Sequence, residues 1–126
     1  MSTLLLLLSG ASLTLAQDDL PTLRELADQN DFYIGAAVYT IHLGNETHRD
    51  VLSREYNMLT PENEAKFCEL QPTRGRFDFT NLDTLMDFAE ENDMTVRGHT
   101  LLWHQCMPSW LENGDFSREE AIEIMR

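Results

Sequence analysis

The stretch VRGHTLLWH, residues 96–104, ends an apolar segment typical of a β-strand and carries two histidines and a tryptophan. A second polar cluster, TPENEAK at residues 60–66, stands about one strand–helix unit upstream and also follows a short strand pattern. In parallel α/β folds, functional side chains gather where the strands end. The two clusters are therefore predicted to form neighbouring rims of one cleft.

Strand and helix patterns alternate outward from these clusters. Residues 32–40 are nearly continuous in apolar character, which predicts a strand buried on both faces. Further strands are predicted at residues 57–59 and 94–102. Helices are predicted at residues 22–30, 49–56, from 80 and from 117, with loops at 44–46, 71–79 and 108–116. In the helix from residue 80, an apolar stripe at i, i+3, i+4 and i+7 predicts packing against a sheet, and its members are Leu82, Leu85, Met86 and Ala89.

The resulting order, a helix and then three βα units, predicts a parallel sheet with right-handed crossovers. A three-stranded parallel sheet would leave a long unpaired edge, so further strands are expected in a barrel or a doubly wound sheet. At 126 residues the chain is shorter than the roughly 200 residues of a complete α/β barrel. The last helix is expected to be cut off. No glycine-rich phosphate loop follows the first strand, which disfavours dinucleotide binding.

Composition is typical of a globular protein, with 42% hydrophobic and 25% charged residues. The formal net charge is −13. Nucleic acids and anionic membranes both require a basic face, so neither is expected as a partner. An acidic surface fits a soluble protein that handles a neutral ligand.

The N-terminus carries an apolar run that begins at Leu4 and suits the core of a secretory signal peptide, although no Lys or Arg precedes it. Small residues up to Ala16 offer a cleavage site, so residues 1–16 are predicted to be a signal peptide and residues 17–126 the mature part. A frayed apolar N-terminus is the alternative interpretation. Secretion would make Asn45, in the triplet Asn45-Glu46-Thr47, a candidate N-glycosylation site.

Two cysteines, Cys68 and Cys106, each follow a predicted strand of consecutive βα units. A secreted chain would permit a disulfide between them, and two buried free thiols are an equally acceptable interpretation. No CxxC or paired metal spacing occurs, so no metal or other cofactor is expected.

The TPENEAK cluster has a purely structural interpretation as the start of a helix. Thr60 can cap, Pro61 suits the first helical position, and Glu62 with Lys66 forms an i,i+4 pair. The number of polar side chains in this short stretch and their position at a strand end favour a functional interpretation. Carboxylate, amide and ammonium groups crowd one strand end and together can bind sugar hydroxyls, the residues being Glu62, Asn63, Glu64 and Lys66.

The VRGHTLLWH stretch also has two interpretations. His99 and His104 can be core histidines and Trp103 simple packing, whereas a tryptophan beside histidines can offer an apolar face to a sugar ring. Arg97, if buried, would need a carboxylate partner, and Glu64 is the candidate. Zinc is not expected, because no third ligand shows metal spacing.

Taken together, TPENEAK, FDFT at residues 77–80 and RGHTLLWHQCMPSWL from Arg97 resemble the N-terminal third of family 10 glycoside hydrolases, the endo-1,4-β-xylanases. The resemblance implies the first three βα units of a (β/α)8 TIM barrel, truncated within the third helix. It implies retaining hydrolysis of internal β-1,4 bonds of xylan. With the predicted signal peptide, we expect a secreted, extracellular protein that is a monomer when complete. Phe67, where many relatives have tryptophan, and Cys68 depart from the family pattern and leave fine substrate preference open.

Carried over by position, Glu62, Asn63 and Lys66 would bind the xylose two units from the cut on the non-reducing side. His99 and Trp103 would line the subsite of the sugar that is attacked. The substrate is thus expected to be xylan or a xylo-oligosaccharide.

The catalytic pair is expected elsewhere. Retaining hydrolysis needs two carboxyl groups about 5–5.5 Å apart. The resemblance places them in motifs like WDVVNE and TELD on the fourth and seventh strands, and neither motif occurs in these 126 residues. We therefore expect a fragment that has no catalytic residue and does not hydrolyse xylan. A glucan-active relative and a non-catalytic carbohydrate-binding or interaction protein built on the same barrel are the alternatives.

Overall fold

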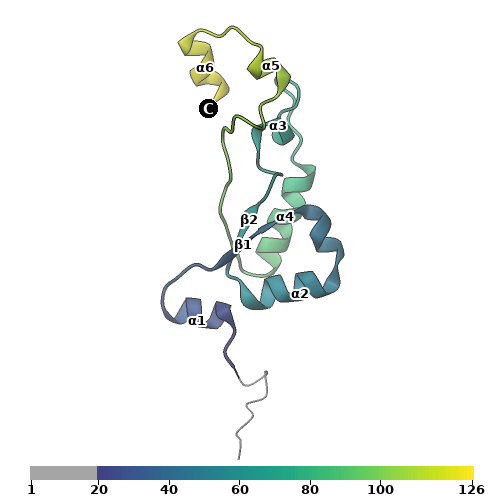
Figure 1. Cartoon of the computed structure of the whole chain (residues 1–126), viewed down its shortest axis with the longest axis vertical. Coiled ribbons are helices and arrows are strands. Elements are labelled where there is room, and N and C mark those ends of the chain that lie inside the picture. Colours follow the sequence, from purple (N-terminus) through teal and green to yellow (C-terminus); the bar gives the residue numbers. More distant parts are fainter. Residues whose placement is uncertain (1–19) are drawn as a thin grey trace, which may run out of the picture.

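The computed structural model describes residues 20–126, and the predicted signal peptide at residues 1–16 lies outside them (Figure 1). The strands are β1 (Gly35–Val38), β2 (Met58–Pro61) and β3 (Thr95–Val96). The helices are α1 (Leu23–Gln29), the 3-10 helix η2 (Thr40–Gly44), α2 (Glu46–Glu55), α3 (Phe67–Leu70), α4 (Thr80–Glu91), α5 (Ser109–Glu112) and α6 (Arg118–Ile124). None of the helices in this range is long and apolar enough to span a bilayer.

The three strands form one parallel sheet in the order β1-β2-β3, as the alternation of patterns predicts. The register aligns Ala36 with Leu59 and Leu59 with Val96, so these three side chains share one face. At Gly35 the strands approach closely, because an added Cβ would lie 2.7 Å from the carbonyl oxygen of Met58. Glycine is therefore required at this position of β1.

The hydrophobic core lies between that face and the helices α2 and α4, which stand beside the strands in Figure 1. Its buried members are Val38, Leu52, Leu59, Leu85, Phe88, Ala89 and Met94. On the opposite face of β1, Gly35 and Ala37 are exposed. The prediction of a strand buried on both faces over residues 32–40 is therefore wrong, because among residues 20–126 helices cover only one side of the sheet.

Helix α1 closes the end of the sheet where the strands begin. It starts with the predicted capping box at Thr22. The Arg24 guanidinium donates to the carbonyl oxygens of Ser53 (3.1 Å), Asn92 (2.8 Å) and Asp93 (2.9 Å), near the C-terminal ends of α2 and α4. Ser53 lies in the last turn of α2, whereas Asn92 and Asp93 directly follow α4, so a cation at that place stabilises both helix ends. Figure 1 shows α1 at the opposite end of the molecule from α3, α5 and α6.

Two predicted helix starts are corrected. Helix α2 begins at Glu46 rather than at residue 49, because the Asn45 side chain accepts a hydrogen bond from the His48 amide at 3.0 Å and caps the helix. The predicted loop at residues 44–46 thus consists of the end of η2 and this cap. Thr60 and Pro61 do not open a helix but end β2, and α3 begins at Phe67 after the N-cap Lys66.

Two predictions in the C-terminal third are also corrected. The strand predicted at residues 94–102 pairs only over Thr95–Val96, because the pairing with β2 ends where the Arg97 amide donates to Leu59. The loop predicted at residues 108–116 contains the short helix α5. The capping box at Ser117 is confirmed and opens α6.

Candidate sugar-binding site

The two polar clusters leave the same edge of the sheet. After β2, the amide of Glu62 donates to the Val38 carbonyl at the end of β1 (3.0 Å), and residues 62–66 then lead into α3. After β3, residues 97–106 run in irregular conformation past that loop. The parallel sheet thereby places both clusters at the carboxyl ends of its strands, where α/β proteins build their sites.

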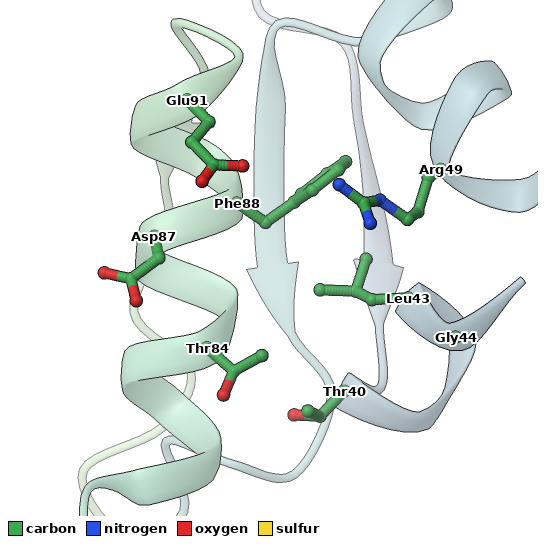
Figure 2. A pocket seen from close by; sticks show the side chains of 8 residues that line it. All are labelled: Thr40, Leu43, Gly44, Arg49, Thr84, Asp87, Phe88 and Glu91. Atoms are coloured by element: carbon green, nitrogen blue, oxygen red, sulfur yellow. The ribbon is translucent and has the colours of Figure 1, made fainter. Parts of the chain in front are cut away.

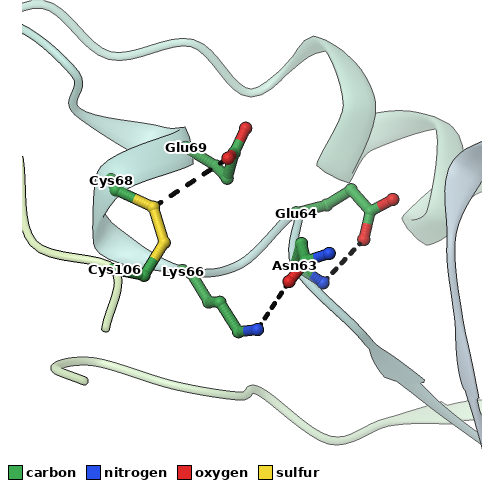
Figure 3. Close-up of a disulfide and its surroundings, with 6 residues drawn as sticks. All are labelled: Asn63, Glu64, Lys66, Cys68, Glu69 and Cys106. Carbon is green, nitrogen blue, oxygen red and sulfur yellow. Dashed lines mark hydrogen bonds between the residues drawn. A yellow bond between two sulfur atoms is a disulfide. The ribbon is translucent and has the colours of Figure 1, made fainter. Parts of the chain in front are cut away.

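Lys66 connects the two clusters. Its side chain is buried, its ammonium donates to the Asn63 side-chain oxygen (Figure 3), and its nitrogen lies 4.4 Å from the centre of the Trp103 ring. A cation at this distance from an indole face is attracted by the electrons of the ring. Asn63, Lys66 and Trp103 therefore form one contiguous group drawn from two consecutive βα units.

The two other sequence-predicted residues, Glu62 and His99, are not joined to this group by side-chain contacts in the described part of the chain. Glu62 is half-buried and His99 is exposed. Within residues 20–126, no side-chain hydrogen bond joins either of them to Asn63, Lys66 or Trp103. His104 contacts Trp103 edge-to-face, with 6.0 Å between ring centres. The predicted i,i+4 ion pair of Glu62 with Lys66 is not formed, because the Lys66 ammonium turns to Asn63 instead.

Glu64 holds the polar loop against the end of β1. Its buried carboxylate accepts hydrogen bonds from the Thr40 backbone amide (2.7 Å), the Thr40 hydroxyl (3.0 Å) and the Asn63 backbone amide (3.1 Å). The pairing of Glu64 with Arg97, expected only if Arg97 were buried, does not arise, because Arg97 is exposed to solvent and needs no partner. Thr40 is a supporting residue that sequence reasoning missed. Its only signal is a polar side chain at the end of a strand pattern.

These contacts set the pKa of Glu64. Burial raises the pKa of this carboxyl, but the hydrogen bonds from Thr40, Asn63 and its own amide outweigh burial and hold the pKa below its ordinary value. The unfolded chain therefore binds the proton at a higher pH than the folded chain does. This contribution to stability is present above the ordinary glutamate pKa and is lost as the pH falls through the lowered value.

Replacing Glu64 by glutamine is expected to reduce the free energy of unfolding by about 1–2 kcal/mol at pH 7, since charged hydrogen bonds become neutral ones. The gap between wild type and E64Q should narrow from pH 7 to pH 3, because the stabilising charge is lost as the pH falls through the lowered pKa of Glu64. Urea unfolding followed by circular dichroism at both pH values measures this. Glu62→Gln in the same loop is the control. A gap that is equal at the two pH values would refute the role assigned to the charge.

A disulfide joins Cys68, in the first turn of α3, to Cys106 at the end of the irregular segment, with 5.2 Å between their Cα atoms (Figure 3). Of the two interpretations that the sequence left open, the structure has the disulfide. The Glu69 carboxylate lies 3.9 Å from the Cys68 sulfur. These three residues bring potential metal-ligand atoms within 4.8 Å of one another, but a metal would bind the sulfurs as thiolates, which a disulfide does not offer.

A cavity of about 430 Å³ lies elsewhere, between η2, α2 and α4 in the helix layer (Figure 2). Arg49 lies over the Phe88 ring there, with 5.7 Å from its guanidinium carbon to the ring centre. None of the sequence-predicted site residues lines this cavity. The candidate site is therefore the group at the strand ends rather than this space.

Comparisons with known proteins identify the family of the chain. The sequence model of glycosyl hydrolase family 10 matches residues 22–126. Endo-1,4-beta-xylanase B of Thermotoga neapolitana is 38% identical over 130 residues, which cover 97% of this chain and 36% of that protein.

Solved structures give the same result. Xylanase 10B of Thermotoga petrophila RKU-1, solved with xylobiose, superposes with a TM-score of 0.75 at 38% identity, covering 82% of this chain and 33% of that one. Native xylanase 10B of Thermotoga maritima gives a TM-score of 0.75 at 39% identity over the same shares. The chain thus spans about a third of these relatives, and its three βα units are those of the N-terminal part of a (β/α)8 barrel, as predicted. By sequence and by fold, the chain belongs to glycosyl hydrolase family 10.

Proposed function

We propose that this chain forms the first wall of the substrate cleft of a retaining endo-1,4-β-xylanase. In this proposal Glu62, Asn63 and Lys66 bind the xylose two units from the cut on the non-reducing side. His99 and Trp103 line the subsite of the sugar that is attacked. The observation that carries the proposal is the contact of buried Lys66 with Trp103, which unites the two clusters at the strand ends.

The chemistry of this group suits a neutral sugar. The Asn63 side-chain amide supplies hydrogen-bond donors and an acceptor, and the Lys66 ammonium supplies further donors. The Trp103 indole, 36% exposed, supplies an apolar face. Retaining hydrolysis further needs a nucleophile and a general acid/base. Within this chain, Glu64 is committed to Thr40 and Asn63, which leaves it a supporting rather than a reacting carboxylate. The assigned roles are therefore binding roles.

The purified 126-residue chain is expected to bind xylotriose without cleaving it, because binding groups are present and the catalytic motifs are not. Isothermal titration calorimetry with xylotriose and with cellotriose measures binding and sugar preference, and chromatography of the incubated sugar detects cleavage. Preference for cellotriose would favour a glucan-active protein. Release of xylose or xylobiose would refute the assignment of binding roles alone.

We propose in addition that residues 1–16 direct the protein to secretion and that the complete protein is a monomer. The exposed position of Asn45 at the start of α2 leaves its sequon accessible for glycosylation. Expression in a yeast secretory host tests this through the N-terminal sequence of the product in the medium and its mass before and after glycosidase treatment. An intact Met1 inside the cells would contradict secretion.

A further inference from the structure

The Cys68–Cys106 disulfide links the two segments that carry the candidate sugar-binding residues. Cys68 stands two residues after Lys66, and Cys106 stands three residues after Trp103. The bond spans 38 residues of sequence, and Figure 3 shows it near Lys66, whose side chain extends to Asn63. It therefore connects the loop after β2 to the segment after β3 at the site itself.

The segment that carries Trp103 has few other attachments. The Arg97 amide donates to the Leu59 carbonyl (2.9 Å), and within the described structure no hydrogen bond joins residues 98–105 to another part of the chain. The Cys106 amide bonds only to the nearby Trp103 carbonyl. Leu101 is 78% exposed and Leu102 is 48% exposed, so apolar packing does not hold this segment either.

The next attachment along the chain comes at α5. The Trp110 indole donates to the Gln71 carbonyl (2.9 Å), and its ring centre lies 5.8 Å from that of Phe67. With the disulfide intact, the free segment runs from residue 97 to 106. Without it, the free segment extends to the buried Pro108, and among the contacts within residues 20–126 the one with Lys66 remains to place Trp103.

We propose that the Cys68–Cys106 disulfide is a positioning element of the sugar site, which holds Trp103 against Lys66 and so makes affinity for xylo-oligosaccharides dependent on the redox state. The inference rests on the proposed function, because the ligand is the one proposed there. An added dithiol reductant such as dithiothreitol breaks the Cys68–Cys106 bond. The reductant gives up two electrons and two protons and becomes a cyclic disulfide, while Cys68 and Cys106 become thiols. The reduced chain keeps every binding group but samples conformations in which Trp103 has left Lys66.

The test compares the oxidised chain, the chain reduced by dithiothreitol and the reoxidised chain. Xylotriose affinity is measured by calorimetry, and the indole N–H signals of Trp103 and Trp110 are measured by ¹⁵N NMR. If reduction leaves about a tenth of the molecules in the binding conformation, the apparent affinity falls about tenfold. The Trp103 signal should shift toward that of an unstructured indole, the Trp110 signal should stay in place, and reoxidation should restore both affinity and signal.

The double variant C68S/C106S should behave like the reduced chain without reductant and should not respond to dithiothreitol. Equal affinity and an unchanged Trp103 signal in both redox states would overturn the proposal. So would loss of both indole signals together with the circular dichroism of the fold, because the disulfide would then act on global stability. If the oxidised chain does not bind xylotriose, the proposed function fails, while the redox response of the Trp103 signal still decides whether the disulfide positions that side chain.

Discussion

Replacing Leu85 by alanine is expected to lower the free energy of unfolding by about 2–5 kcal/mol, the range for deleting a large aliphatic side chain from a closed core. Leu85 lies on α4, is fully buried and belongs to the core between α4 and the sheet. Small domains have a total stability of about 5–15 kcal/mol, so this variant should be largely unfolded at modest urea concentrations. Urea unfolding followed by circular dichroism at 222 nm measures the loss.

Met86 provides the matched control for Leu85. It follows Leu85 on the same helix and is 43% exposed, so Met86→Ala should change the free energy of unfolding by no more than about 0.5 kcal/mol. Equal unfolding midpoints for the two variants would contradict the packing of α4. A larger loss in Met86→Ala than in Leu85→Ala would show that the helix buries a different face.

The same helix shows how far the apolar pattern predicts the fold. The stripe correctly gives the existence of α4 and the burial of Leu85 and Ala89, but it includes the exposed Met86 and omits the buried Phe88. Met86 lies about 100° around the helix from Leu85, at the margin of the stripe. Which margin is buried depends on a neighbour, since Arg49 of α2 lies over the Phe88 ring. The sequence of α4 alone does not contain that information.

Tertiary pairing also overrides local sequence preference at the strand end. Thr60 and Pro61 have the sequence of a helix start, yet in the sheet they align with Ala37 and Val38 of β1. Proline lacks an amide hydrogen and fits there because β2 ends at this residue and the next amide, that of Glu62, donates to β1. The parallel pairing was predicted, but the length of the strand was not.

The candidate site was likewise predicted only in part from the sequence. That the clusters at residues 60–66 and 96–104 lie at one edge followed from the alternation of strands and helices, and the structure brings Asn63, Lys66 and Trp103 together there. The hydrogen bonds that hold their loop in place did not follow from the sequence. Glu64 binds Thr40, 24 residues earlier, and the predicted partner Arg97 faces solvent instead. A short polar side chain at a strand end gives too weak a signal to identify such a partner.

Replacing Trp103 by alanine is expected to weaken xylotriose binding by about 2 kcal/mol, or roughly 30-fold, as for a tryptophan at the centre of a binding surface. Two effects contribute. The sugar loses the apolar face of the indole, and the Lys66 ammonium loses the ring 4.4 Å away and gains freedom to leave the position proposed for sugar binding. Trp103→Phe keeps an aromatic face and should recover part of the affinity. Calorimetric titration of each variant with xylotriose measures the effects.

His104→Ala tests whether the effect belongs to Trp103 rather than to the segment. His104 is adjacent, exposed and in contact with the indole, yet it is not among the proposed binding residues, so its removal should change the affinity by less than about threefold, or 0.7 kcal/mol. Combining Trp103→Ala with Lys66→Met should cost less than the sum of the single changes, because each removes the same cation–aromatic contact. Strict additivity would mean that Lys66 and Trp103 bind the sugar independently, and an undiminished affinity in Trp103→Ala would remove Trp103 from the site altogether.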